Sequence, residues 1–259
     1  MKKYVLALLA MTIAPFSALA VDGVVLINQS TVMAAGGFPY FIAAAGSYKL
    51  SGNLIVPAGV DGIDVHSPDV TLDLNGFSIT ATGTSLSTGF GIATAAQNFS
   101  LRNGTIRNFS IGVFSTGTGQ ITDLHATRNG TGFVLATCGL ASSMSFANAA
   151  IRACSIGGFE SSLSGFVIAR ASANSNHENG FDLADAAVSD SVSSGNSEFG
   201  FSVIRSSLIH NVADGNGVLG IQGVLSVFAS NIVVNNGEFS LNDLSGGSQK
   251  NNFCTGGLC

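Results

Sequence analysis

The sequence has no tryptophan, four prolines and few charged side chains. Charged residues make up 10% of the 259 positions, whereas ordinary globular domains carry about 25%. Ten basic residues against fifteen acidic ones give a net charge of −5, which leaves no basic patch for nucleic acid. The chain is instead rich in glycine, with 33 residues. Together with many Ser, Thr and Asn residues, this composition suits short strands joined by tight turns.

Long hydrophobic runs are missing after residue 20. Residues 1–20 combine a charged start at Lys2 and Lys3, an apolar run from Tyr4 to Ile13, and small residues at Ala18-Leu19-Ala20. This is the pattern of a secretory signal peptide, and the run is shorter than the roughly 20 residues that span a bilayer. A retained N-terminal anchor is the alternative. We expect a secreted, periplasmic or extracellular protein without membrane insertion, whose remaining chain carries a net charge of −7.

Four cysteines lie beyond this segment. Cys254 and Cys259 enclose a short flexible loop, and Cys138 and Cys154 are sixteen residues apart, close to one repeat. An oxidising compartment favours two disulfides, although the sequence leaves the connectivity open. A metal site is the alternative for all four, but their spacing matches no zinc pattern. For Cys138 and Cys154, buried free thiols are a further alternative.

Several columns of residues recur every twenty positions. The first column is asparagine: Asn176, Asn196, Asn216 and Asn236. Four residues later come Gly180, Gly200, Gly220 and Ser240, each followed by an apolar residue. Eight residues before each asparagine lie Ile168, Val188, Leu208 and Phe228. A period near twenty in several columns at once is typical of a stacked solenoid.

The columns mix Ile, Val, Phe and Leu without a helical period, which favours a β-helix over a leucine-rich repeat. We predict an all-β, single-stranded right-handed parallel β-helix with N- and C-terminal caps. The expected divisions are a signal peptide at 1–20, a cap at 21–45, the β-helix at 46–245 and a tail at 246–259. Roughly nine coils stacked about 4.8 Å apart would make a rod about 45 Å long. Repeat spacings in the first half drift between about 18 and 26 residues.

The asparagine column has a structural explanation. Asparagine tolerates the left-handed backbone angles of a sharp bend, and stacked coils would place each amide above the next. Bonds between these amides would form a ladder that penalises a slip in register. Ligand binding by the same asparagines is the alternative.

These columns resemble the right-handed parallel β-helix repeat proteins of the pectin-lyase-like superfamily. The segment from Gly46 to Ile79, with Val70-Thr71-Leu72-Asp73-Leu74-Asn75-Gly76, resembles the first coils of secreted bacterial members. The resemblance covers most of residues 46–245. It implies the fold, and it implies a choice of functions that includes polysaccharide lyases, glycoside hydrolases, uronan epimerases and non-catalytic adhesins.

Two columns are candidate sites of chemistry. The outward position after each Gly-Phe pair holds Asp182, Ser202 and Gln222, with Val134 and Val167 expected earlier in the same row. This row has one acid and no base. Six residues before each asparagine lie Arg170, Asp190, His210 and Ser230, with Asp123 in the looser repeat. We expect a bend there that exposes the side chains. Arg170, Asp190 and His210 are the catalytic candidates if the protein is an enzyme; a surface row of compensating charges is the alternative.

Two acidic patches were considered as binding or metal sites. One contains His177, Glu178, Asp182 and Asp185, and the other contains Asp61, Asp64, His66 and Asp69. Their oxygens and imidazoles are possible calcium or transition-metal ligands, but no metal motif is present. We therefore predict no metal or cofactor, with calcium as the open possibility. Asp123, His177 and Asp182 are the candidate binding residues.

Sparse charge and the lack of a mixed acid–base row favour a non-catalytic secreted solenoid that contacts polysaccharide or a surface protein. The alternative is a carbohydrate-active enzyme, a lyase or epimerase on an acidic glycan. The sequence leaves the oligomeric state open.

Overall fold

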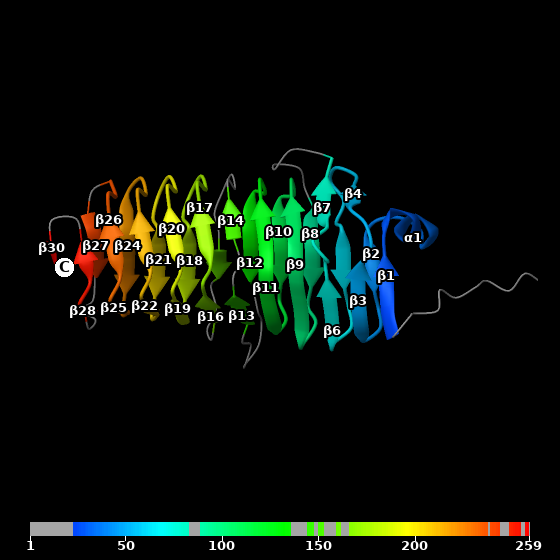
Figure 1. The fold of residues 1–259 in the computed structure, drawn as a ribbon, viewed down its shortest axis with the longest axis horizontal. Coiled ribbons are helices and arrows are strands. Elements are labelled where there is room, and N and C mark those ends of the chain that lie inside the picture. Colours follow the sequence, from blue (N-terminus) through cyan, green and yellow to red (C-terminus); the bar gives the residue numbers. More distant parts are fainter. Residues whose placement is uncertain are drawn as a thin grey trace, which may run out of the picture.

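The structure is a computed structural model that describes residues 23–82, 89–135, 144–147, 150–152, 159–161, 166–237, 239–243, 249–254 and 257–258. The chain winds into a right-handed parallel β-helix of roughly nine turns, and Figure 1 shows its coils side by side along one axis. The predicted all-β class and solenoid architecture are confirmed. The expected signal peptide lies outside the described residues. Within those residues, no helix is long and apolar enough to cross a bilayer.

Each coil contributes strands to three faces. The first face holds β1 (Val24–Ile27), β3 (Gly46–Leu50), β6 (Val70–Asp73), β13 (Met144–Ala147), β16 (Phe166–Ala169), β19 (Ala186–Ser189), β22 (Ser207–Ile209), β25 (Val227–Ala229) and β28 (Gln249–Lys250). The second holds β4 (Leu54–Val56), β7 (Ser78–Ala81), β14 (Ala150–Arg152), β17 (Ser172–Asn174), β20 (Val192–Ser194), β23 (Val212–Asp214), β26 (Ile232–Val234) and β29 (Phe253–Cys254). The third holds β2 (Tyr40–Ile42), β5 (Ile63–Val65), β8 (Phe90–Thr94), β10 (Ile111–Ser115), β12 (Thr131–Leu135), β15 (Phe159–Ser161), β18 (Phe181–Ala184), β21 (Phe201–Ile204), β24 (Leu219–Val224) and β27 (Phe239–Asp243).

Two long strands belong to the first and second faces at once. β9 (Phe99–Arg107) and β11 (Gly119–Thr127) pair along their whole length. Asn103 and Asp123 have positive φ angles of 62° and 51° within them. The strands therefore bend where the other coils break into two separate strands.

The coil pattern extends into both expected end segments. β1 pairs with β3 and β2 pairs with β5, so the first coil begins within the range expected for the cap. In this coil the helix α1 (Gln29–Ala34) follows β1 in place of a second-face strand. Gln29 accepts from the Ile55 N–H at 2.9 Å and donates to the Ile55 carbonyl at 3.2 Å, which satisfies part of the β4 edge. At the other end β28 and β29 still pair in parallel with β25 and β26.

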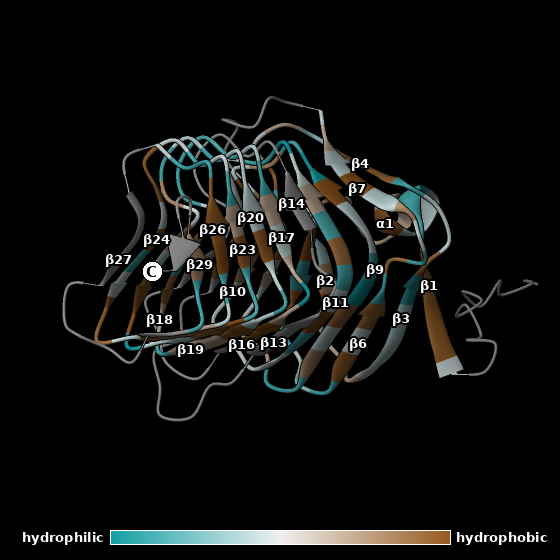
Figure 2. Cartoon of the chain, turned by 60° about the vertical axis from the view of Figure 1, so that its left-hand side comes forward, coloured by the Kyte–Doolittle hydropathy of each residue, from teal (hydrophilic) through white to brown (hydrophobic). Residues whose placement is uncertain are grey.

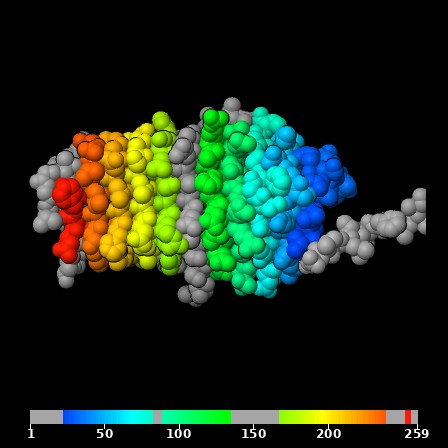
Figure 3. Space-filling view, in the orientation of Figure 1, coloured from blue at the N-terminus to red at the C-terminus, as the bar shows by residue number. Residues whose placement is uncertain are grey.

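Apolar side chains fill the interior of the coils. The column of Ile168, Val188, Leu208 and Phe228 is buried, and the rings of Phe181 and Phe201 stack with centroids 4.6 Å apart. Where the larger Phe228 enters, the facing position is Gly223, whose added Cβ would lie 2.2 Å from that ring. Figure 2 shows the brown, hydrophobic segments concentrated on the strands, and Figure 3 shows successive coils as successive bands of the rod.

Most corners of the later coils use one local device. A residue with left-handed backbone angles is followed directly by an Asn or Ser, whereas Ala171 and Ala186 take that place after Arg170 and Asp185. At the second-to-third corner, Ser175, Gly195, Gly215 and Asn235 have positive φ and precede the asparagine column. The bend turns the N–H of this Asn or Ser toward the next coil. The side chain of the equivalent residue in that coil accepts the hydrogen bond.

The asparagine column forms a continuous ladder. The N–H and Nδ2 of Asn176 both donate to Oδ1 of Asn196, at 3.0 and 2.8 Å. Asn196 donates in the same way to Asn216, and Asn216 to Asn236. Each Nδ2 of the last three also reaches a backbone carbonyl of the preceding coil, as Asn196 does with Ala173 at 3.1 Å. Side chains thus take over the backbone pairing that the strands interrupt at the corner.

Two further ladders escaped the sequence analysis. At the first-to-second corner, Ser191, Asn211, Asn231 and Asn252 accept from the N–H of the equivalent residue in the preceding coil. At the third-to-first corner, Ser206 and Ser226 do the same. The spacing of twenty between Asn211 and Asn231 was available in the sequence.

Removing one rung should cost more than removing an exposed asparagine. Asn196→Ala leaves several buried donors and acceptors without partners, each costing about 1–3 kcal/mol. We expect a loss of about 2–4 kcal/mol in the free energy of unfolding. Asn251 is exposed and has a φ of 53°, so Asn251→Ala should lose only the left-handed preference, about 1 kcal/mol. Denaturant unfolding of both variants measures the difference, and equal losses would reject the ladder.

Candidate active site on the third face

A hollow lies on the outer surface of the third face, across β5, β8 and β10. Ile63 and Val65 of β5 point into the core, which leaves Asp64 between them on the outside. Asp64 is in register with Ala93 of β8, and Ala93 with Phe114 of β10. Beyond the strand ends, His66, Ala95 and Thr116 line the same hollow. Three neighbouring coils thus contribute to one site.

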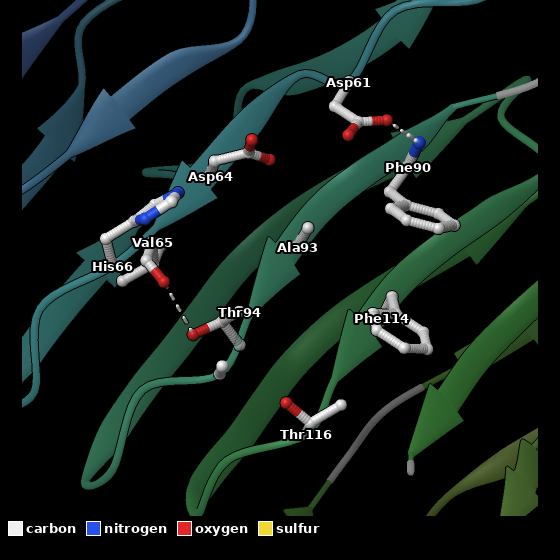
Figure 4. Close-up of a pocket in the computed structure, with 10 residues that line it drawn as sticks. Asp61, Asp64, Val65, His66, Phe90, Ala93, Thr94, Phe114 and Thr116 are labelled. Atoms are coloured by element: carbon white, nitrogen blue, oxygen red, sulfur yellow. Dashed lines mark hydrogen bonds between the residues drawn. The ribbon is translucent and has the colours of Figure 1, made fainter.

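The hollow exists because Ala93 and Ala95 of the middle coil have short side chains, whereas the residues beside them on the neighbouring coils have longer ones. Ala93 and Ala95 form the floor, whereas Asp64 and His66 rise on one side and Phe114 and Thr116 on the other. The resulting pocket has a volume of about 330 Å³, within the range of small-molecule sites. Figure 4 shows Asp61, Asp64 and His66 along one wall and the two phenylalanine rings opposite.

The far wall is an aromatic pair. The rings of Phe90 and Phe114 stack with centroids 5.0 Å apart and an angle of 16° between their planes. Both residues are partly exposed, and their ring faces and edges supply an apolar surface. On the opposite side, Phe41 contacts the His66 ring edge-on, with centroids 5.5 Å apart.

The near wall carries two carboxyl groups and an imidazole. Asp61 is anchored, because its Oδ1 accepts from the Phe90 N–H at 2.6 Å. Asp64 is half-buried, and its Oδ1 is a buried acceptor without a hydrogen-bond partner in the described part of the chain. Burial raises the pKa of Asp64, and the neighbouring Asp61 raises it further, while His66 opposes the shift. Asp64 therefore holds its proton to a higher pH than an ordinary aspartate does.

Glycines let these coils stack closely. Gly62, Gly91 and Gly112 each precede the inward residue of their strand, and a Cβ added to any of them would lie 2.5 Å from the carbonyl oxygen of the next such glycine. Gly180 and Gly200 occupy the same place in the later coils. The pocket coils therefore repeat the later Gly-apolar-outward pattern, with Asp64, Ala93 and Phe114 as its outward residues. This signal could have located the site from the sequence.

The catalytic candidates of the sequence analysis lie elsewhere. Asp123, Arg170, Asp190 and His210 all have φ angles between 51° and 57°, at the corner between the first and second faces. This is the bend that the sequence predicted. The Nδ1 of His210 lies 3.9 Å from Oδ1 of Asp190, and more than half of each side chain is exposed. The row is stacked coil upon coil along an outer edge and lines no part of the third-face pocket.

The binding candidates are spread over different faces. Asp123 lies at the first-to-second corner, His177 is exposed in the turn after Asn176, and Asp182 is on the third face. Burial raises the pKa of Asp182, while hydrogen bonds from Asn179 and Ser202 oppose the shift. In the second acidic patch, Asp69 is at a corner and accepts from Asn98 at 2.7 Å. Asp61, Asp64 and His66 of that patch are the residues brought together.

One position was assigned to the wrong row. Val167 was expected beside Val134 and Asp182, but it lies in β16 on the first face and pairs with Ala187. A Gly-Phe pair precedes Val167 in the sequence, as in the later columns, but Val167 lies on a different face. The strand in that register is instead β15, where Glu160 pairs with both Val134 and Asp182.

The cysteine and metal predictions remain predictions. Cys138, Cys154 and Cys259 lie outside the described residues, and Cys254 is buried in β29. β30 (Gly257–Leu258) pairs antiparallel with β29, which turns the chain back toward Cys254. Among the described residues, no group of three or more His, Cys, Asp or Glu side chains is placed to hold a metal ion.

Comparison with known proteins gives a likeness of architecture. No protein-family model matches the chain, and no curated protein matches its sequence. A periplasmic alginate epimerase AlgG, T265N T268M double mutant, is 12% identical over 89% of this chain and 72% of its own, with a TM-score of 0.49. The A-module of Azotobacter vinelandii mannuronan C-5 epimerase AlgE6 is 13% identical over 83% and 82%, with a TM-score of 0.46. An alginate lyase from Paenibacillus sp. str. FPU-7 is 11% identical over 89% and 98%, with a TM-score of 0.40. Identities this low concern the fold and no activity.

The raised pKa of Asp64 leads to a prediction about stability. The folded chain holds this proton more tightly than the unfolded chain does, so stability falls as the pH rises from the ordinary value near 3.8 through the folded pKa. That cost is present at pH values above the folded pKa. Asp64→Asn removes the charge. Because Asp64 is partly exposed, solvent screening keeps the gain below about 1 kcal/mol, which would raise the thermal midpoint by at most about 2–4 °C.

Thermal unfolding between pH 4 and pH 8 provides the measurement. Asp190→Asn, at an exposed corner, is the control and should leave the midpoint unchanged. A midpoint for Asp64→Asn at or below that of the wild type at pH 7 would contradict the proposed burial cost.

Proposed function

We propose that this protein is a carbohydrate-active enzyme that moves protons on an acidic polysaccharide, as a lyase or an epimerase, with one sugar bound in the third-face pocket. The observation that carries the proposal is Asp64, a carboxyl group with a buried, unpartnered oxygen and a raised pKa beside the His66 imidazole. A group in a cleft whose pKa is shifted by burial is a candidate catalytic group. A polysaccharide as partner and an extracellular or periplasmic location of the protein are part of the same proposal.

The two walls divide the work of binding and chemistry. The Phe90 and Phe114 rings offer an apolar surface on which the C–H face of a sugar can stack. The alanine floor leaves room for the ring. The other edge of the sugar then faces Asp64 and His66, the candidate general acid and general base on the opposite wall.

Each group has a role in the proposed reaction. The imidazole of His66 removes the proton from carbon 5 of a uronic acid, next to its carboxylate. Protonated Asp64 donates a hydrogen bond to that carboxylate, where negative charge grows as the proton leaves. Expulsion of the oxygen at carbon 4 then gives the unsaturated product of a lyase, and the proton held by His66 passes to the leaving oxygen. Delivery of a proton from water to the opposite face of carbon 5, while His66 keeps the abstracted proton, gives the epimer.

A second function is favoured by one observation. None of the ten residues that line the pocket is Lys or Arg, so an acidic sugar meets no fixed positive charge there. This favours a non-catalytic module that binds neutral polysaccharide in the same pocket. Absence of turnover together with binding of a neutral polymer would support it.

The deciding experiment incubates the purified protein with alginate, the polymer named for the similar structures, and with other acidic and neutral polysaccharides. Light scattering reports loss of polymer mass, ultraviolet absorbance reports unsaturated sugars, and proton exchange in D₂O detected by NMR reports epimerisation. We expect turnover of an acidic polymer, with a loss of about 10²–10⁴-fold in Asp64→Asn and His66→Gln. Asp214→Asn, on the second face, is the matched control and should retain activity.

The same assay tests the corner row as an alternative site. If Asp190→Asn and His210→Gln abolish turnover while Asp64→Asn and His66→Gln do not, the catalytic groups are at the corner and the pocket assignment is wrong. If no acidic polymer reacts or exchanges protons, the enzyme proposal fails.

Filling the floor should block the pocket in either function. Ala93→Leu adds the side chain that the middle coil lacks, at a partly exposed position that needs no repacking of the core. We expect loss of polysaccharide binding with an unchanged thermal midpoint. Binding at wild-type affinity in Ala93→Leu, measured by calorimetry, would place the sugar site elsewhere.

A further inference from the structure

The outward row of the third face continues past the pocket to an exposed aromatic ring. Phe41 of β2 is in register with Asp64 of β5, so Phe41, Asp64, Ala93 and Phe114 stand on four consecutive coils. With strands about 4.8 Å apart, Phe41 and Phe114 are about 14 Å apart along the rod. The wall of Asp64 and His66 lies between them.

Phe41 is largely exposed, at 57%. Its ring and the His66 ring meet edge to face, with centroids 5.5 Å apart and an angle of 69° between their planes. Phe41 lies one coil beyond Asp64, on the side away from Ala93. An exposed ring one coil beyond the pocket wall offers an apolar surface on which a sugar can stack.

The pocket itself has room for little more than one sugar. Its volume of about 330 Å³ is at the lower end of the range for ligand sites. A polymer seated there must therefore leave it across one of the walls. On the Asp64 and His66 side, the next coil offers the Phe41 ring, and β2 is the edge strand of the third face, so nothing in that sheet obstructs the exit.

We propose that Phe41 is a second sugar subsite, and that a glycan of at least two sugars lies along the rod axis with the linkage between them over Asp64 and His66. The inference rests on the proposed function, because it requires a sugar in the pocket. It adds a substrate class: internal segments of a polymer are bound, and single sugars are bound weakly. It also places the bond between two sugars next to the acid and the base.

Calorimetry with defined oligosaccharides tests the subsite. The probes are alginate oligosaccharides and cello-oligosaccharides of one to six sugars, an acidic and a neutral series. We expect Phe41→Ala to weaken binding of chains of two or more sugars about five- to tenfold, as loss of one aromatic contact implies, and to leave the single sugar unaffected. Phe41→Tyr should bind as the wild type does.

The control is Phe253→Ala on the second face, because Phe253 is 53% exposed and so nearly matches Phe41; its affinities should not change. If Ala93→Leu abolishes binding but Phe41→Ala has no effect that depends on chain length, the subsite is rejected and the pocket stands. If the wild type binds neither series at any length, the subsite and the proposed function are both rejected.

Discussion

The hydrogen bond between a corner N–H and the Asn or Ser side chain of the next coil is the interaction on which this structure depends. Strands pair along the faces, but each sharp bend turns a backbone group away from that pairing, and a buried unpaired N–H would cost about 1–3 kcal/mol. The ladders through Asn196, Asn211 and Ser206 supply the missing acceptors at all three corners. They work only if every coil keeps the same spacing between corners, which explains the strict period from Ile168 to Leu241. Regular corners in turn hold the three faces flat enough for outward residues to stand in rows.

The third-face pocket is a local exception made within that regular frame. Gly62, Gly91 and Gly112 keep the backbones of three coils in close contact, so the outward residues that follow can differ without disturbing the stack. Acidic, small and aromatic residues follow in turn, and the small one opens a space between the other two. The partial burial that raises the pKa of Asp64 also favours the protonated form on which the proposed chemistry depends. Burial of the Asp64 carboxylate therefore lowers the stability of the folded chain at the wall where we propose catalysis.

The fold could be predicted from the sequence because its columns are local and repeated. The asparagine spacing, the inward column ending at Phe228 and the bend at Asp190 needed no knowledge of distant contacts. The pocket could not be assembled in the same way. Gly62 and Gly91 are 29 residues apart, whereas Gly91, Gly112 and Gly132 follow one another at 21 and 20 residues. The longer first interval hides that Asp64, Ala93 and Phe114 share a row. Asp61, Asp64 and His66 were recognised as a patch, but the aromatic wall and the alanine floor follow only from the register of β5, β8 and β10.

The length of the rod can change without a change in the candidate active site. Each coil contacts the coil before it and the coil after it, and the pocket uses the strands from β5 to β10. Gain or loss of whole coils beyond β12 would change the reach of the molecule along a polymer while the acid, the imidazole and the aromatic wall kept their mutual distances. A chain of this kind can evolve a longer or shorter track for its ligand by duplication, independently of the residues that act on it.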